Sequence, residues 1–148
     1  MKNNNKSENL KEKLKQALNS TARVISDDFD IKESSEKNKS SKKFEFFNLE
    51  SLNSKSDFIK ARAESDSLAL KKKFSNEKIY KKNLPSNLSC RSLYSIAEKI
   101  RCESLGGQML KGIQKNFTEN YNQMINFKRK DQIKSKDAVS INEAFELY

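Results

Sequence analysis

The stretch of sequence that decides the fold runs from residue 85 to residue 107 and reads PSNLSCRSLYSIAEKIRCESLGG. Asn87 and its neighbouring serines supply side-chain oxygens that can accept from the free N–H groups of a first helical turn. Apolar residues then recur at helical spacing, at Leu93, Ile96, Ala97 and Ile100. Gly106 and Gly107 follow, and glycine permits the left-handed backbone that often ends a helix. The stretch therefore predicts an amphipathic helix that is capped at both ends.

A second apolar stripe follows the two glycines. Its members step by three or four residues, as one face of a helix requires, at Leu110, Ile113, Phe117, Tyr121 and Met124. Two amphipathic helices joined at a double glycine make a helical hairpin or a corner. The predicted fold class is mainly α, and α+β at most: a helical bundle built on this two-helix hairpin, with a small β-hairpin near the N-terminal third.

The rest of the chain adds shorter elements. A helical stripe covers residues 10–25, and Asp27 and Asp28 suit a turn after it, because carboxylates are poorly placed at a helix C-terminus. A further helix is predicted over 61–74, and Ser75 is predicted to cap a short turn that ends at Lys82. The β-hairpin would pair residues 29–32 with residues 44–49.

Composition shifts along the chain predict its domain organisation. The predicted parts are a flexible tail at 1–7, a helical domain at 8–127 with a mobile loop at 33–43, and a charged link with the start of a truncated helix at 128–148. In the last part, Ser140 and Glu143 have the spacing of a capping box.

The chain is strongly basic, with a net charge of +10, and 25 of its 30 basic residues are lysine. Phosphate groups and base edges are gripped best by arginine, whose fork of donors binds in bidentate fashion. The composition therefore favours the general lysine and asparagine bias of an AT-rich genome over a nucleic-acid surface. A small basic nucleic-acid-binding protein is the alternative.

Several functions are excluded by what the sequence lacks. It has no histidine, which removes His-based acid–base catalysis and most zinc sites. Cys90 and Cys102 would lie on different faces of one helix, so they are expected to be free thiols of a cytoplasmic protein. No apolar run is long enough to cross a membrane, and the N-terminus lacks the apolar core of a signal peptide.

Three charged residues of the first helix are candidate functional residues. Glu98 and Arg101 are three apart and can pair along one helix surface. Glu103 lies near the apolar face and is expected to be partly buried. Two carboxylates in a cleft could perform acid–base or metal chemistry, so an enzyme that uses Glu98 and Glu103 is one hypothesis. An ordinary surface ion pair is the favoured interpretation.

The same residues resemble the N-terminal region of the CobT subunit of aerobic cobaltochelatase. The resemblance rests on two helices and the segment that follows them, and its matching positions are Asp66, Ala69, Leu70, Ala97, Glu98, Arg101, Glu103, Leu105, Gly106 and residues 112–116. Thr21 and Arg23 are also similar to an opening helix of that family, and 140–147 is similar to its next helix.

The sequence departs from the family in two respects. Its short turn at 76–80 lacks the family's histidines. The resemblance also implies a truncated or split form of the subunit, which is expected to lack the family's acidic linker and von Willebrand A-type domain. The resemblance implies a non-catalytic assembly module with no catalytic, cofactor or metal residues of its own. Cobalt and ATP would be handled by partner subunits: an AAA+ ATPase subunit, and a separate A-type-domain part or the large chelatase subunit. The expected framework residues are Glu98, Arg101, Glu103 and Gly106.

Overall fold

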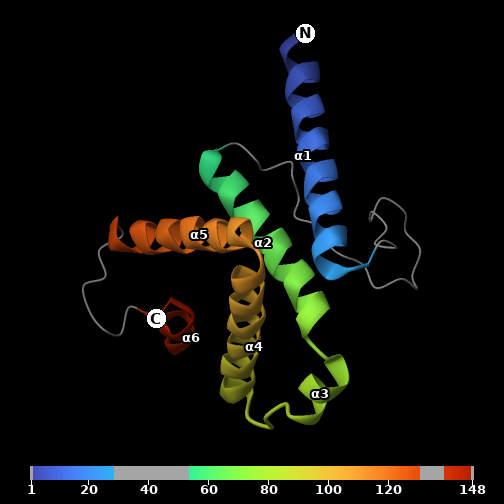
Figure 1. The fold of residues 1–148 in the computed structure, drawn as a ribbon. Coiled ribbons are helices and arrows are strands. Elements are labelled where there is room, and N and C mark those ends of the chain that lie inside the picture. The colour runs from blue at the N-terminus through green and yellow to red at the C-terminus, as the bar shows by residue number, and fades with distance from the viewer. Residues whose placement is uncertain (1, 29–53, 131–138, 148) are drawn as a thin grey trace. The chain divides into compact units, whose positions relative to one another are not determined.

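The computed structural model describes residues 2–28, 54–130 and 139–147, and it is helical in these ranges (Figure 1). The helices are α1 (Lys2–Ser26), α2 (Lys55–Phe74), α3 (Glu77–Lys82), α4 (Leu88–Met109), α5 (Lys111–Lys130) and α6 (Ile141–Leu147). No strand occurs in the described ranges, which confirms the mainly α prediction. The predicted strands at 29–32 and 44–49, and the loop at 33–43, lie outside the described residues.

The chain divides into two compact units, residues 1–69 and 70–148. The parts predicted from the sequence, a tail at 1–7, a domain at 8–127 and a link at 128–148, have other boundaries than these units. They stay predictions. In the first unit, α1 begins well before the predicted stripe and ends at Ser26, where Asp27 adopts a positive φ of 53°. This confirms the predicted turn. The unit buries apolar side chains from both of its helices, at Leu18, Ala22, Ile25, Ile59, Ala61, Ala63 and Ala69.

Asparagine side chains start two helices of the second unit. The Asn87 side chain accepts hydrogen bonds from the N–H groups of Ser89, at 2.9 Å, and Cys90, at 3.3 Å, which confirms the predicted start of α4. In α3 the cap is Asn76, which accepts from the backbone N–H groups two and three residues later. The prediction that Ser75 caps α3 is therefore wrong by one residue.

The prediction that Gly106 and Gly107 end the first helix is also wrong. Helix α4 continues through both glycines to Met109, and the extended backbone of Leu110 (φ −133°, ψ 104°) ends it. No glycine of the described residues has a positive φ. The physical reason for Gly106 is close packing, because a Cβ atom built there would lie 2.3 Å from Cδ1 of Leu70. Gly106 lets the α2 side chain approach the backbone of α4.

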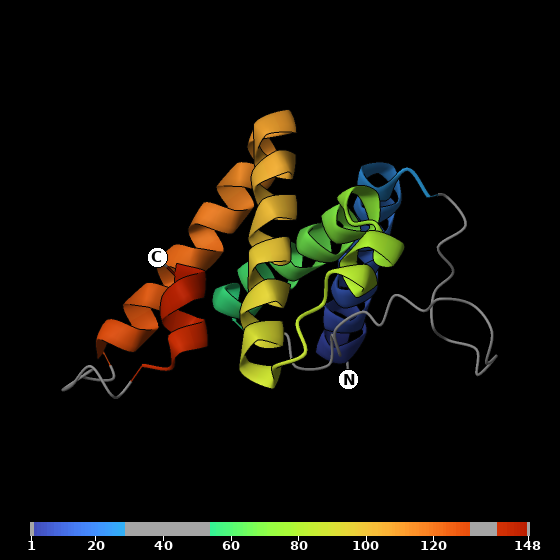
Figure 2. The same cartoon turned by 90° about the horizontal axis from the view of Figure 1, so that it is seen from below.

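From Leu110, α4 and α5 diverge as the two sides of a V, and α6 lies between them, against α4 (Figure 2). The two-helix prediction is thus confirmed as a corner rather than a tight hairpin. Of the predicted second stripe, Ile113 and Phe117 are buried, whereas Leu110, at the corner itself, is exposed. Helix α6 starts as predicted, since the Ser140 hydroxyl oxygen accepts from the N–H group of Glu143 at 3.3 Å. No helix in the described ranges combines the length and apolar content needed to cross a membrane.

Candidate functional site

Arg101 fastens the end of α2 to α4. Its guanidinium group donates two hydrogen bonds to the carboxylate of Glu98, at 2.8 and 2.9 Å, and this bidentate geometry confirms the predicted pair. The same group also donates to the backbone carbonyl of Phe74, at 2.8 Å. Phe74 is the last residue of α2, where carbonyl groups lack helical partners and a positive charge is favoured. Arg101 therefore acts as a cap supplied by another helix.

The charge of Glu98 is stabilised by the groups around it. The hydrogen bond from Arg101 lowers the pKa of this carboxyl group, and a hydrogen bond with the Ser75 side chain and the charge of Lys71 act in the same direction. Glu98 in turn raises the pKa of Arg101 further above its ordinary value. Both groups therefore stay ionised at neutral pH. This arrangement suits a structural ion pair and leaves neither group ready to transfer a proton.

Cys102 lies beside this pair and is almost fully buried, at 1% exposure. Burial raises the pKa of its thiol, so the reactive thiolate is disfavoured. Cys90 is exposed on the same helix, and both cysteines are free, as predicted. The burial of Cys102 is typical of a packed, structural cysteine.

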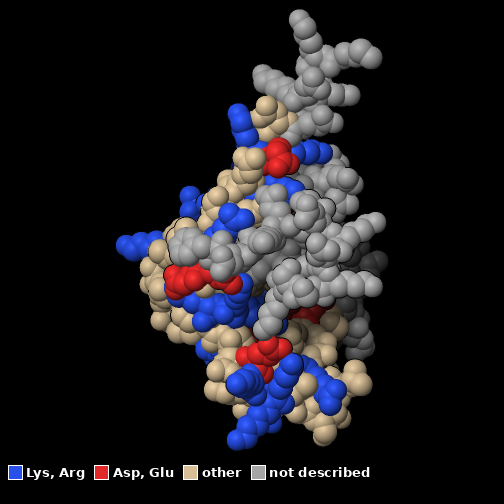
Figure 3. All heavy atoms as spheres, turned by 90° about the vertical axis from the view of Figure 1, so that its right-hand side faces the viewer, with Lys and Arg blue, Asp and Glu red and all other residues tan. Residues whose placement is uncertain are grey.

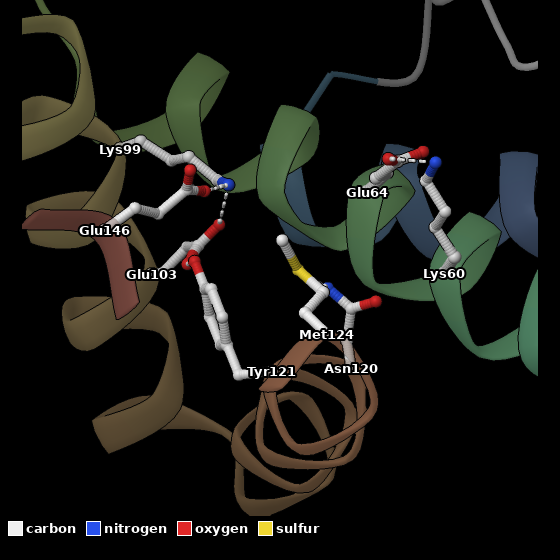
Figure 4. Close-up of polar contacts among 8 residues, drawn as sticks. All are labelled: Lys60, Glu64, Lys99, Glu103, Asn120, Tyr121, Met124 and Glu146. Atoms are coloured by element: carbon white, nitrogen blue, oxygen red, sulfur yellow. Dashed lines mark hydrogen bonds and ion pairs between the residues drawn. The ribbon is translucent and has the colours of Figure 1, made fainter. Parts of the chain in front are cut away.

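Glu103 belongs to a different set of contacts, shown in Figure 4. The Tyr121 hydroxyl group donates to its carboxylate at 2.7 Å, and the Lys99 ammonium group lies 3.9 Å from the other carboxylate oxygen. Lys99 also forms an ion pair with Glu146. We call these four residues, from α4, α5 and α6, the Lys99 cluster. Glu103 is 7% exposed, so the predicted partial burial is confirmed.

The hydroxyl group of Tyr121 acts only as a donor in the Lys99 cluster. Burial raises its pKa far above the ordinary value, and the hydrogen bond to Glu103 acts in the same direction. The Lys99 ammonium group also lies 5.7 Å from the centre of the Tyr121 ring, within range of a cation–π interaction. Lys99 thus holds three side chains from three helices. The cluster fixes the V formed by α4 and α5 and fastens α6 to it.

A cavity of about 450 Å³ opens beside the Lys99 cluster. Glu103, Tyr121 and Glu146 supply its polar wall, and Phe117 and Phe145 supply part of its apolar wall. These three polar residues belong to the Lys99 cluster, and other polar residues, among them Gln114 and Asn122, also line the cavity. One side of the cavity is therefore formed by contacts that hold helices together.

The two candidate carboxylates do not form one catalytic pair. Glu103 lies five positions after Glu98 on α4, which places the two side chains about 140° apart around the helix axis. Each has its own partners, Arg101 and Tyr121 respectively. In the described ranges, no three or more histidine, cysteine, aspartate or glutamate side chains group to hold a metal ion. The arrangement gives no support to the enzyme hypothesis.

Sequence reasoning missed three members of the Lys99 cluster. Lys99 could have been found, because it lies four residues before Glu103 and such pairs meet on a helix. Tyr121 was assigned to an apolar stripe, although its hydroxyl group needs a partner when buried. No local pattern in the sequence points to Glu146, because its contact with Lys99 joins residues 47 positions apart.

A family model described as cobalamin biosynthesis protein CobT matches residues 8–148. The chain belongs to the CobT family. The match spans all of α2 to α6 and most of α1, so it confirms the resemblance proposed from the sequence. Comparisons with curated proteins and with solved structures give no match.

The four framework residues of this CobT family member lie on α4 and meet neighbouring helices in three ways. Glu98 and Arg101 hold the C-terminal end of α2. Glu103 receives the Tyr121 hydroxyl group from α5. Gly106 accommodates the side chain of Leu70. These four of the positions that carried the resemblance are thus positions where α4 contacts other helices.

Proposed function

We propose that this CobT family chain is a non-catalytic assembly module of an ATP-dependent cobaltochelatase in cobalamin biosynthesis. In this proposal the chain binds an AAA+ ATPase subunit and the polypeptide that carries the A-type domain or the large chelatase subunit. Cobalt is the substrate that the complex inserts. ATP hydrolysis and metal insertion belong to the partner subunits.

The observation that carries the proposal is how the charged residues of α4 are used. Arg101 caps α2, Glu103 binds Tyr121 of α5, and Lys99 pairs with Glu146 of α6. Each of these groups has a partner on another helix that restrains its position. A catalytic acid or base needs a pKa near the working pH, whereas Glu98 and Tyr121 have pKa values shifted away from neutrality. Such a framework suits a rigid module that presents a surface.

Binding to the ATPase subunit tests the proposal directly. Cys90 is exposed and Cys102 is buried, so a maleimide dye can be placed on Cys90 of the folded protein. The labelled chain is titrated with the purified AAA+ ATPase subunit from the same source, with ATP, with ADP and without nucleotide. We expect saturable binding at micromolar concentrations or below. A Cys90→Ser sample treated with the same dye controls for labelling elsewhere.

An assay of cobalt insertion with reconstituted subunits then tests whether the chain acts as an assembly module. The ATPase and large subunits are assayed with and without the chain, and with the chain alone. We expect insertion to depend on the chain, and the chain alone to hydrolyse no ATP. The proposal fails if the chain neither binds the ATPase subunit in any nucleotide state nor changes the rate of insertion. It also fails if the chain alone hydrolyses ATP.

A further inference from the structure

The strongest charge concentration of the described residues lies at the end of α2 and in α3. Residues 71–82 contain six lysines and one glutamate, a net charge of +5, which is half that of the whole chain. Lys71, Lys72 and Lys73 form the last turn of α2, and Lys81 and Lys82 form the last turn of α3. We call residues 71–82 the α3 surface. All of it belongs to the second unit.

The α3 surface faces outward. Its lysines are exposed except for Lys73, which is half-buried. In Figure 3, basic side chains gather at the lower end of the view, the level at which α3 lies in Figure 1, with acidic side chains beside them. The one acidic residue of the surface, Glu77, pairs with Lys81 at 2.8 Å. The net field of this surface is therefore positive, and it attracts an acidic partner.

The apolar and aromatic residues of the α3 surface distinguish between two acidic partners. Ile79 is 59% exposed among the lysines, so an apolar side chain is available for contact. The ring of Tyr80 is engaged by the Tyr94 ring, with centroids 5.1 Å apart, and by Lys71 at 5.9 Å. Single-stranded nucleic acid needs aromatic rings on which bases can stack. The segment also has no arginine, the residue that binds phosphate in bidentate fashion.

We propose that the α3 surface is a docking site for an acidic protein segment that carries an apolar side chain. Its carboxylates would pair with the lysines of α3 and the end of α2, and its apolar side chain would cover Ile79. Because lysine ammonium groups on flexible stems hold no fixed geometry, the surface would recognise charge density more than an exact sequence. The proposal rests on the charge and exposure of residues 71–82 and does not depend on the cobaltochelatase role.

The probe is a fluorescent 14-residue peptide of glutamates with one central leucine, followed by anisotropy at about 50 mM salt. We expect saturable binding that weakens as salt is raised, because the lysine charges are screened. The triple variant Lys78→Gln/Lys81→Gln/Lys82→Gln should weaken binding about tenfold. Glutamine keeps a high helix propensity, so α3 is retained, and circular dichroism checks this.

A matched control removes the same charge elsewhere. The variant Lys13→Gln/Lys111→Gln/Lys115→Gln changes three exposed lysines outside the α3 surface and should change affinity less than about twofold. Ile79→Ser, or replacing the leucine of the peptide by serine, should weaken binding by about threefold.

Each other result overturns the proposal. The two triple variants could weaken binding equally, which would show attraction to net charge alone. An oligothymidine or a DNA duplex could bind more tightly than the peptide and lose that binding in the α3 triple variant, which would make the surface a nucleic-acid site. No binding of the peptide at low salt would leave the α3 surface without the proposed role.

Discussion

Replacing Gly106 by alanine should destabilise the protein, although alanine normally stabilises a helix. Gly106 lies inside α4, and its φ is not positive, so alanine can adopt this backbone. The new Cβ atom, however, would lie 2.3, 2.4 and 2.9 Å from Cδ1, Cδ2 and Cγ of Leu70. Leu70 is 1% exposed, so its side chain has little room to move away. Either the side chain or the helix must shift.

The magnitude follows from two opposing effects. Overpacking of a tight core costs about 1–3 kcal/mol, and three contacts of 2.9 Å or shorter place Gly106→Ala in the upper part of that range, at about 2–3 kcal/mol. Alanine in place of glycine in a helix interior stabilises the protein by about 1 kcal/mol. We therefore expect Gly106→Ala to lower the free energy of unfolding by about 1–2 kcal/mol. The matched change, Gly107→Ala, should raise it by up to about 1 kcal/mol, since its Cβ atom would meet Gln114 at an ordinary 3.5 Å.

Urea denaturation followed by circular dichroism measures both variants. A double-mutant cycle with Leu70→Ala then assigns the effect to the contact. Once the leucine side chain is shortened, the alanine at position 106 has room, so Gly106→Ala should no longer destabilise and the coupling should be about 1–3 kcal/mol. The reasoning is refuted if Gly106→Ala is as stable as the wild type, or if the two changes add. If Gly107→Ala were the damaging change, a left-handed helix end would be the better explanation.

Three further predictions concern the charged groups and the thiols. Tyr121→Phe should lower the free energy of unfolding by about 1–2 kcal/mol, measured by thermal denaturation, because the buried carboxylate of Glu103 loses its 2.7 Å donor; an unchanged melting temperature would contradict this. The lowered pKa of Glu98 means that its stabilisation is present above the ordinary value of 4.5 and disappears as the pH falls through the folded-state pKa. The difference in the free energy of unfolding between wild type and Glu98→Gln should therefore shrink as the pH falls from 7 to 3. A constant difference would show that ionised Glu98 does not cause it. A thiol reagent should modify Cys90 quickly and Cys102 only after unfolding, and two fast thiols in the folded protein would show that the burial of Cys102 is incorrect.

Local patterns in the sequence predicted local structure well. Three predictions depend on residues within a few positions of one another: the helices α4 and α5, the Asn87 cap and the Glu98–Arg101 pair. Each of them is confirmed. The role of Gly106 was misjudged because glycine is compatible with both a helix end and a close contact. Only the position of Leu70, 36 residues earlier, distinguishes the two. The partners of Glu103 were missed for the same reason, since they come from other helices.

The framework residues of α4 also explain why part of the family resemblance lies in residues that hold helices together. Helix α4 contacts two other helices with different faces. Arg101 and Glu98 hold α2, and Glu103 holds α5. A helix that makes such contacts on more than one face has few positions that tolerate an amino-acid replacement. A replacement on either face leaves a buried or paired group without its partner. Glu98, Arg101 and Glu103, which belong to the pattern that relates this chain to CobT, are therefore also residues that this packing requires. The exposed side chains within residues 71–82, Ile79 among them, are less restricted by packing, and it is there that binding to a partner should be sought first.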